Sequence, residues 1–530
     1  MDLSFIWDHF KIAIDQAAEF IIPYSTTPKV IVQTKPNNDH DQERKNISRL
    51  RNDIKRIRAF AIYARSHLDK EIDDHRFVDG NILIEKLNMN FDCQFKSLGK
   101  NWTMPWIIDT NQNIRLCNNI LASRLKSYDT NKIKLQVDKR CAYIATNQRS
   151  LVNSLMNKTF RSIKLDRAVN YDEEGHMELI TEPELLKIQC DKEYGSMFRK
   201  RNHQFDSDSE NWIQWKTYYE PLKGFNDNIY KGLDDIPSYD EIMVALATRK
   251  DSSAPGTSNI GYAMIKHLPR DCIIALGKFF HICFRSSQVP LQWKWSSLYP
   301  IPKPKDWNYR ISITRPILLI ECTRKLMMKI FTTRLSGILQ DHNILKGLNF
   351  TALKGESTSS PIALLQCIME DAREKNNELW IVCQDMAKAF DSVGLTPLRF
   401  ALERLKLPLN IVSFIINIFK ERHIQIITYF GLTNGFVAQD GIDQGEIISP
   451  LLWRIFYDPL LCRIQGNSSF GYVMKWHGHT QADPLRIAAS AFADDTIWIG
   501  KSRTETQSII DMSNTFFLSM TLKSMEINQS

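Results

Sequence analysis

An acidic pair, Asp494 and Asp495, is enclosed by apolar sequence on both sides and limits how this part of the chain can fold. The run reads Ala-Phe-Ala before the pair and Thr-Ile-Trp-Ile after it. Burying two adjacent charges is costly unless they lie at a turn or face a cation. The pattern therefore predicts a strand, a tight turn and a second strand. Taken alone, an ordinary hairpin with an acidic tip is the alternative interpretation.

A further acidic residue, Asp385, comes at the end of a short run that is rich in strand formers, residues 379–384. Good helix formers follow it, so the pattern places Asp385 at a junction between a strand and a helix. Reactive side chains are commonly exposed at such strand ends. Three carboxylates delivered by two adjacent strands can hold two Mg²⁺ ions for phosphoryl transfer. Phe390 would then stand over the same site, although a Phe at this spacing is more often a core residue.

Three segments follow one another in an informative order. Residues 384–393 read Gln-Asp-Met-Ala-Lys-Ala-Phe-Asp-Ser-Val, residues 441–452 read Gly-Ile-Asp-Gln-Gly-Glu-Ile-Ile-Ser-Pro-Leu-Leu, and residues 492–495 read Phe-Ala-Asp-Asp. Together they resemble motifs A, B and C of reverse transcriptases, and the nearest match is the non-LTR, LINE-like retrotransposon class. Group II intron reverse transcriptases share the motifs and are the nearer alternative. Viral RNA-dependent RNA polymerases fit less well, because they typically have Gly before the Asp pair.

The resemblance implies an RNA-directed DNA polymerase whose partners are an RNA template, a DNA primer and dNTPs, with no membrane. It implies that Asp385 and Asp494 are the principal metal ligands, that Asp495 contributes more weakly, and that Mg²⁺ is the cofactor, with Mn²⁺ as a substitute. Phe390 is then the steric gate against a 2′-hydroxyl. The primer 3′-oxygen attacks the α-phosphate in line, and pyrophosphate leaves. Electrostatics favour the same metal-binding role, because clustered carboxylates acquire raised pKa values unless divalent cations neutralise them.

Two upstream cations resemble the residues of the fingers hairpin that grip the incoming triphosphate. Lys303 lies in a proline-rich run, residues 300–305, and Arg315 precedes Pro-Ile. Lys supplies a point charge, and Arg a planar fork that takes phosphate oxygens in pairs. The sequence departs from the family's Tyr-Arg-Pro-Ile by inserting residues 311–314, so Arg310 competes with Arg315, which the following Pro-Ile favours. An exposed proline-rich edge with solvated cations is the plain alternative.

Motif B offers a second predicted substrate surface. Gly445 permits close backbone approach, and Gln444 can hydrogen-bond near the base or sugar. The Ser-Pro that follows predicts a helix over residues 451–461, which is also consistent with a capped core helix. Upstream, residues 253–260 resemble the short Pro-Gly segment at the start of the fingers, and taken alone they predict a turn.

Composition suits a large nucleic-acid enzyme and argues against a secreted protein. The chain length predicts about two to four domains, and 43% hydrophobic residues are ample for folded cores. The net charge of +8 permits phosphate binding only through local basic patches. The ten cysteines have no zinc-like spacing, which predicts an intracellular protein of the nucleus or cytoplasm. Acidic residues near the N-terminus argue against a signal or transit peptide, and no apolar run is long enough to span a bilayer.

The N-terminal part is predicted to be mainly helical, with an amphipathic helix over residues 5–20 and a polar linker over residues 25–42. The next helix has an apolar seam formed by Ile47, Leu50, Ile54 and Ile57. It also carries a run of cations: Arg44, Lys45, Arg49, Arg51, Lys55, Arg56 and Arg58. Such a face is usually only solvated, and contact with RNA or DNA is the alternative.

The sequence therefore predicts an α+β protein with the fingers and palm of a right-hand polymerase, the palm being a small antiparallel sheet backed by helices. We expect a helical extension over residues 1–210, a connector over 211–239, fingers over 240–375 and a palm over 376–530. Only 35 residues follow Asp495, so we expect the family's thumb to be absent. The functional alternative is a truncated remnant that binds nucleic acid with weak or no polymerisation.

Overall fold

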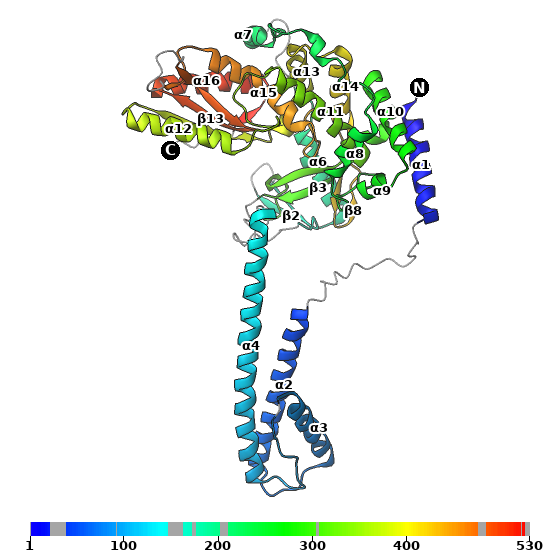
Figure 1. The fold of residues 1–530 in the computed structure, drawn as a ribbon, viewed down its shortest axis with the longest axis vertical. Helices are drawn as coiled ribbons and strands as arrows, with labels where there is room; N and C mark the ends of the chain where they lie inside the picture. The colour runs from blue at the N-terminus through cyan, green and yellow to red at the C-terminus, as the bar shows by residue number, and fades with distance from the viewer. Residues whose placement is uncertain are drawn as a thin grey trace. The chain divides into compact units, whose positions relative to one another are not determined.

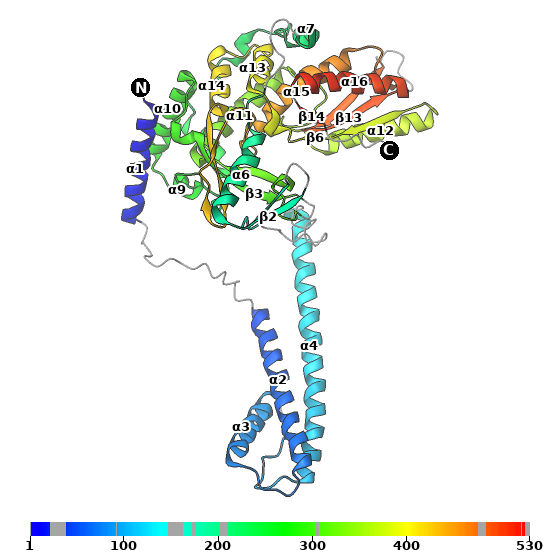
Figure 2. The same cartoon turned by 180° about the vertical axis from the view of Figure 1, so that it is seen from behind.

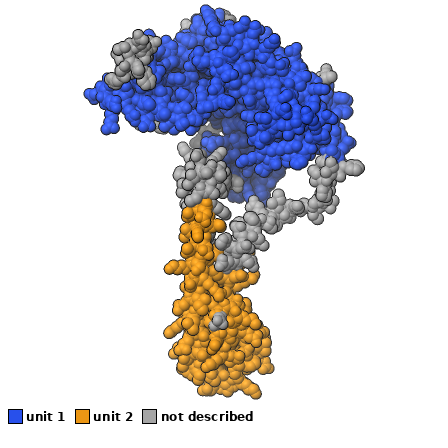
Figure 3. Space-filling model, in the orientation of Figure 1, with its two compact units in different colours: residues 1–21, 161–530 blue, residues 22–160 orange. Residues whose placement is uncertain are grey.

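The structure is a computed structural model that describes residues 2–21, 39–91, 93–146, 163–171, 176–201, 210–303, 307–474, 484–520 and 522–524. The chain folds into two compact units, which Figure 3 distinguishes by colour. One is Ile22–Phe160, and the other joins Met1–Ile21 to Arg161–Ser530. Helices and small sheets are both present, in agreement with the predicted α+β class.

The described part of Ile22–Phe160 is mainly helical, and its helices are α2 (Asp39–Ser66), α3 (Asp74–Phe91) and α4 (Met104–Thr146). α2 packs along α4, as Figures 1 and 2 both show. The predicted apolar seam is confirmed, because Ile47, Leu50, Ile54 and Ile57 are all buried. None of the described helices, the 43-residue α4 included, combines the length and apolarity needed to cross a membrane.

A five-stranded sheet in the larger unit adjoins the predicted triphosphate cations. Its strands are β3 (Trp295–Pro302), β4 (Thr314–Leu319), β7 (Arg422–Thr428), β8 (Gly431–Leu432) and β9 (Phe436–Ala438). β3 pairs antiparallel with β4 and parallel with β7. Alternate residues of these strands are buried beneath α6 (Pro183–Met197). The other set of alternate residues, which includes Arg315, therefore lies on the opposite face.

A three-stranded antiparallel sheet carries the predicted acidic residues. Its strands are β5 (Trp380–Gln384), β12 (Ala489–Phe492) and β13 (Asp495–Gly500), in the order β12, β13, β5. The strand, turn and strand predicted around Asp494 are thus confirmed. Three helices pack on this sheet, with α15 (Ser449–Gly466) and α16 (Arg503–Ser519) on one side and α12 (Ser359–Glu374) on the other.

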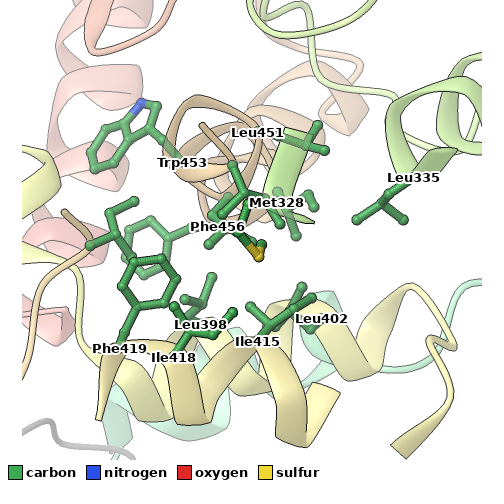
Figure 4. Packing of buried hydrophobic residues seen from close by; sticks show 14 of the residues in the cluster. Met328, Leu335, Leu398, Leu402, Ile415, Ile418, Phe419, Leu451, Trp453 and Phe456 are labelled. Carbon is green, nitrogen blue, oxygen red and sulfur yellow. The ribbon is translucent and has the colours of Figure 1, made fainter. Parts of the chain in front are cut away.

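The largest hydrophobic core joins helices from distant parts of the sequence. It includes α15 together with α11 (Cys322–Asp341), α13 (Leu395–Arg404) and α14 (Leu409–Phe419). Figure 4 shows side chains of these helices facing one another, among them Met328, Leu402, Ile415 and Phe456. Thirteen of the 18 residues of α15 are buried, which is typical of a helix at the centre of a core. The helix predicted after motif B is therefore confirmed.

Further helices and strands belong to the described part of the larger unit. The helices are α1 (Leu3–Ile21), α7 (Glu210–Lys216), α8 (Tyr239–Ala247), α9 (Tyr262–Lys266) and α10 (Arg270–Ser286). The strands are β1 (Ala168–Tyr171), β2 (Met177–Ile180), β6 (Met386–Ala387), β10 (Tyr472–Met474), β11 (Leu485–Ile487) and β14 (Lys523–Ser524). They form three two-stranded pairs, β1 with β2, β6 with β14, and β10 with β11.

The compact units follow boundaries that differ from those of the predicted domains. α1 packs on the larger unit, where the ring centroids of Trp7 and Trp293 lie 5.2 Å apart. α6 belongs to the same unit because its apolar face covers the five-stranded sheet. The predicted extension over residues 1–210 is thus divided between both units. Most of the predicted linker, residues 25–42, lies outside the described residues.

Candidate active site

The three predicted metal ligands lie at neighbouring strand ends. β5 ends at Gln384, whose partner on β13 is Thr496. The next antiparallel positions, Asp385 and Asp495, therefore come opposite each other, and Asp494 lies in the turn between β12 and β13. Asp385 and Asp495 are exposed, whereas Asp494 is half-buried. The fold thus brings carboxylates from two distant segments to one edge of the sheet.

The electrostatics of these carboxylates agree with the predicted repulsion. Burial, and then the neighbouring carboxylates of Asp495 and Asp385, raise the pKa of Asp494, while the Arg315 guanidinium lowers it. Burial and the Asp385 carboxylate also raise the pKa of Asp495. A divalent cation among these oxygens would relieve the repulsion, because it neutralises the charges that oppose one another.

The donor chemistry of this site fits a hard divalent cation, because Asp385, Asp494 and Asp495 all supply carboxylate oxygens. In the part of the chain that the structure describes, however, no three His, Cys, Asp or Glu side chains are grouped closely enough to hold a metal ion. The three carboxylates therefore influence one another electrostatically without forming a closed ligand set. Two of them are exposed and can rotate toward a cation without disturbing the core.

Two buried side chains hold the turn that carries the acidic pair. Ala493 has a φ of 55°, in the left-handed region that is unfavourable for a residue with a Cβ. The Asn349 Nδ2 donates to the Ala493 carbonyl oxygen at 3.2 Å, and the Asn349 Oδ1 accepts from the Ala493 amide at 3.3 Å. The Trp453 Nε1 donates to the same carbonyl at 2.8 Å. These hydrogen bonds offset the backbone strain at the turn.

The prediction of a helix directly after Asp385 is wrong. β6 follows instead, Lys388 has a φ of 55°, and a 3-10 turn covers Phe390–Ser392 before α13 begins. Pairing of β6 with β14 overrides the local helix propensity of these residues. Phe390 is half-buried, and its ring centroid lies 5.9 Å from that of Trp453. The predicted sugar gate therefore packs on the same indole that holds the acidic turn.

Gln444, a predicted substrate contact, has its side-chain amide on a buried carboxylate. Its Nε2 donates to both oxygens of Asp391, at 3.1 and 2.9 Å. Burial raises the pKa of Asp391 to about 7, although the Gln444 hydrogen bond and the charges of Lys388, Arg422 and Arg201 lower it. Sequence reasoning did not single out Asp391, because its environment is built by residues far along the chain, among them Gln444 and Arg201.

Gly445 stands where β4 approaches the motif B loop, which we define as residues 439–448 between β9 and α15. The φ of Gly445 is 120°, and a Cβ there would lie 2.9 Å from the Leu318 carbonyl oxygen. The Leu318 amide donates to the Gln444 carbonyl at 2.9 Å, which ties the loop to the five-stranded sheet. Glycine fits both the backbone angle and the close approach.

A buried cluster of four charged side chains joins the motif B loop to β7 and α11. Arg422 on β7 pairs with Asp443, and the Arg324 Nη2 on α11 lies 3.4 Å from the Asp443 Oδ2. The Arg324 Nε lies 2.8 Å from the Glu446 Oε2. Burial and the neighbouring Arg324 charge lower the pKa of Arg422 to about 9. Because each side chain is at most 2% exposed, removing one partner would leave an uncompensated buried charge.

The two predicted triphosphate cations lie in or next to the hairpin of β3 and β4. Arg315 lies on the exposed face of β4, and its charge acts on Asp494. Lys303 directly follows β3 and is half-buried. The competing Arg310 instead places its guanidinium over the Tyr171 ring, 5.1 Å from the centroid. Arg315, rather than Arg310, is therefore the arginine associated with the acidic site.

Comparison with known proteins agrees with this geometry. Residues 301–529 match the family model "Reverse transcriptase (RNA-dependent DNA polymerase)". A Drosophila melanogaster protein named probable RNA-directed DNA polymerase from transposon BS is 26% identical over 282 residues, which is 52% of this chain and 29% of that protein. A retrovirus-related Pol polyprotein from type-1 retrotransposable element R2 of Nasonia vitripennis is 25% identical over 271 residues, 51% of this chain and 24% of that protein. Residues 301–529 therefore carry a reverse transcriptase-type domain. The alignments span less than a third of either relative.

The reverse transcriptase domain is joined to the predicted Pro-Gly segment, residues 253–260, through Glu321. The Ser258 amide and the Thr257 hydroxyl donate to the Glu321 Oε1 at 2.7 and 2.9 Å. A Cβ on Gly256 would lie 2.6 Å from the Glu321 amide nitrogen. The segment therefore packs tightly on the start of α11, which it reaches only because Gly256 lacks a side chain.

Sequence reasoning missed several residues that shape the site of the reverse transcriptase domain. Arg201, which follows α6, donates from Nη1 to the Asp391 carbonyl at 3.1 Å. Asn349 and Trp453 hold the acidic turn. Trp453 directly follows the motif B segment, and this position in the sequence could have indicated that it lies near the site. Asn349 and Arg201 gave no signal, because their roles depend on contacts with residues far along the chain.

Proposed function

We propose that this chain contains the polymerising centre of an RNA-directed DNA polymerase, which joins a dNTP to the 3′-hydroxyl of a primer on an RNA template. The observation that carries the proposal is the meeting of Asp385, Asp494 and Asp495 at one sheet edge, with Arg315 acting on Asp494 from the other sheet. Clustered carboxylates suit divalent cations, and a guanidinium beside them suits the phosphates that such cations accompany. The names of the relatives support the same reaction class.

Asp385 and Asp494 are the proposed principal ligands of Mg²⁺, and Asp495 is the weaker ligand. When bound, two Mg²⁺ ions stabilise the attacking and leaving oxygens of nucleotidyl transfer. Asp494 is the half-buried member of the set. Its pKa is raised because burial and the neighbouring carboxylates disfavour its negative charge. Binding a divalent cation would offset this effect. Mn²⁺ accepts the same oxygen donors and is the proposed substitute.

The nucleotide contacts are proposed to come from both sheets. Lys303 and Arg315 bind the triphosphate, and Phe390 excludes a 2′-hydroxyl. Gln444 and Gly445 line the base or sugar side. Support comes from the charge of Arg315 near Asp494 and from the packing of Phe390 beside the acidic turn. Because the Gln444 amide is bound to a buried carboxylate, its direction is set by the protein rather than by the nucleotide.

In this proposal, the three-stranded sheet with α15 and α16 is the palm of a right-hand polymerase, and the hairpin of β3 and β4 belongs to the fingers. The proposed sequence ranges are 376–530 for the palm and 240–375 for the fingers. β7 crosses this division, because it lies in the palm range but pairs with β3. The described cysteines are free thiols, which suits the proposed intracellular location.

Primer extension by the full chain tests the proposal. A DNA primer annealed to an RNA template should be extended with dNTPs and Mg²⁺ or Mn²⁺, and a chelator should stop the reaction. Asp494→Asn should abolish extension, because it removes a charge opposite the cation. Asp511→Asn, at an exposed position of α16, is the matched control and should extend like the parent. Parental extension by Asp494→Asn would overturn the metal assignment. Extension on DNA templates alone would overturn the reaction class.

A further inference from the structure

The acidic turn is held by side chains from outside the three sequence motifs. Asn349 lies between α11 and α12, and Trp453 lies on α15. Asn349 is 1% exposed and Trp453 is fully buried, so neither side chain is placed to meet a substrate directly. Both nevertheless bond to Ala493, the residue directly before Asp494.

The segment around Asn349 extends the pairing of β12. The Phe350 amide donates to the Ala491 carbonyl at 2.9 Å, and the Ala491 amide donates to the Leu348 carbonyl at 2.8 Å. The Asn349 side chain then continues this pattern into the turn, using its amide nitrogen and its oxygen on the two backbone groups of Ala493. The backbone of the acidic turn is thereby paired from outside its own hairpin.

The Trp453 indole has two neighbours that matter for the site. Its Nε1 donates to the Ala493 carbonyl, and its ring lies 5.9 Å from the Phe390 ring with an interplanar angle of 36°. The Trp453 ring also stacks on the Tyr457 ring, and their centroids lie 5.4 Å apart. One rigid side chain therefore connects the acidic turn to the proposed sugar gate.

We propose that Asn349 and Trp453 are positioning residues for the metal-binding turn, and that Trp453 also sets the position of Phe390. Two donors on one carbonyl and an acceptor for the same residue's amide fix Ala493 in its left-handed conformation. That conformation determines the direction in which the chain enters Asp494. The role of Phe390 in this inference rests on the proposed function, whereas the role of the turn requires only that its carboxylates bind a divalent cation.

The arrangement goes beyond what packing alone would need. An apolar side chain of similar size could fill the space of Asn349, but it would leave the Ala493 amide without its acceptor. A glycine in place of Ala493 would adopt the same φ without strain. The chain instead keeps a strained residue and surrounds it with hydrogen bonds, which is the pattern of a turn whose geometry serves a site.

Two variants and one control separate the contacts. Asn349→Ala removes both hydrogen bonds to Ala493 and leaves the contact with Phe390 in place. Trp453→Phe removes the Nε1 donor and also reduces the ring that packs on Phe390. Trp293→Phe is the matched control, because Trp293 is equally buried and its Nε1 has no hydrogen-bond partner among the described residues. Thermal unfolding of the full chain establishes that each variant is folded.

Binding of Mn²⁺ is the first readout, measured on the full chain from the electron paramagnetic resonance signal of the free ion, and it needs no turnover. We expect Asn349→Ala and Trp453→Phe to raise the Mn²⁺ dissociation constant about tenfold, the effect of losing roughly one to two hydrogen bonds. Trp293→Phe should bind like the parent. The second readout is selection of dNTPs over rNTPs, which should fall severalfold in Trp453→Phe and stay parental in Asn349→Ala.

Parental Mn²⁺ affinity in both variants would overturn the positioning of the turn, as would an equal loss in Trp293→Phe or a parent chain that binds no Mn²⁺. Equal loss of sugar selection in both variants would overturn the separate link to Phe390. If Trp453→Phe does not fold, Asn349→Ala decides the role of the turn. A parent that binds Mn²⁺ but extends no primer would refute the proposed function, while the Mn²⁺ titration would still decide the positioning.

Discussion

The two compact units of this chain use charge in opposite ways. In the larger unit, four buried charged side chains form ion pairs that join the motif B loop to β7 and α11: Arg324, Arg422, Asp443 and Glu446. In the helical unit, six cations of α2 are exposed and form no ion pair with any residue that the structure describes: Lys45, Arg49, Arg51, Lys55, Arg56 and Arg58. The buried acid of α2, Asp53, is paired with Lys86 at 2.6 Å.

The difference shows that a buried charge constrains the positions of its neighbours, whereas an exposed charge does not. A buried ion pair demands a defined geometry, because separating it leaves a charge in a medium that solvates it poorly. An exposed cation is hydrated and screened by salt, so its neighbours need no defined arrangement. The larger unit therefore uses charge to fix a loop beside the site. The exposed cations of α2 concentrate positive charge without a defined arrangement, which is consistent with either a solvated face or contact with phosphates.

Breaking the buried cluster should have the largest effect. Arg422→Met leaves the buried Asp443 without its closest cation, so we expect the free energy of unfolding to fall by about 3–5 kcal/mol. The matched change in the helical unit, Arg56→Met, should alter it by less than about 0.5 kcal/mol. Urea unfolding of the full chain followed by tryptophan fluorescence measures both. Equal effects of the two changes would erase the contrast between the units.

The charge of Arg315 should affect the nucleotide rather than the template. Losing a charged hydrogen-bond partner costs about 1.5–3 kcal/mol, so Arg315→Ala should raise the KM for dNTP about ten- to a hundredfold. Template affinity should change little. Arg310→Ala is the control, because that guanidinium lies over Tyr171, and it should leave the KM near the parental value. A change in template affinity alone would reassign Arg315 to the nucleic-acid track.

Asp391 predicts how the stability of the larger unit depends on pH. Burial raises its pKa from 3.8 to about 7, so the folded state binds the proton more tightly than the unfolded state. The resulting stabilisation is complete below pH 3.8 and is lost as the pH rises through about 7. Asp391→Asn, which stays neutral, should therefore flatten this part of the profile. Urea midpoints across the range measure it, and an unchanged slope in the variant would contradict the assignment.

Changes to the exposed cations of α2 should have the smallest effect, and they test whether this helix contacts phosphates. Combining Arg49→Glu with Arg56→Glu should leave the extension rate at saturating template unchanged, because neither residue belongs to the larger unit, which carries the proposed active site. If the face contacts phosphates, the slope of log affinity for RNA against log salt should become shallower by about two. A solvated face predicts an unchanged slope. Repeating the measurement with DNA distinguishes the two nucleic acids.

Local patterns were sufficient to predict the acidic hairpin and the apolar seam of α2. In each case the signal lies in neighbouring residues, since strand alternation and helix periodicity place side chains on a face whatever the rest of the chain does. The helix expected after Asp385 failed for the converse reason. Its residues favour a helix locally, but pairing of β6 with β14 and the left-handed Lys388 give them another conformation.

The hydrogen-bond partner of Gln444 could not be predicted either, because it lies far away in the sequence. A sequence motif indicates that a side chain is available near a substrate, but Asp391 takes both hydrogen bonds of the Gln444 Nε2. The same limit applies to the site as a whole. Which carboxylates, cations and glycines occur could be listed from the motifs, whereas their mutual contacts could not.

The resemblance to reverse transcriptases, the acidic residues and the positions of the strands that carry them could be predicted from the sequence, because they depend on residue type and short spacing. The action of Arg315 on Asp494, the buried ion cluster at the motif B loop, and the hold of Asn349 and Trp453 on the acidic turn emerged only from the folded structure. Those contacts join residues that are remote in sequence, and burial fixes their energies, so they exist only once the chain has folded.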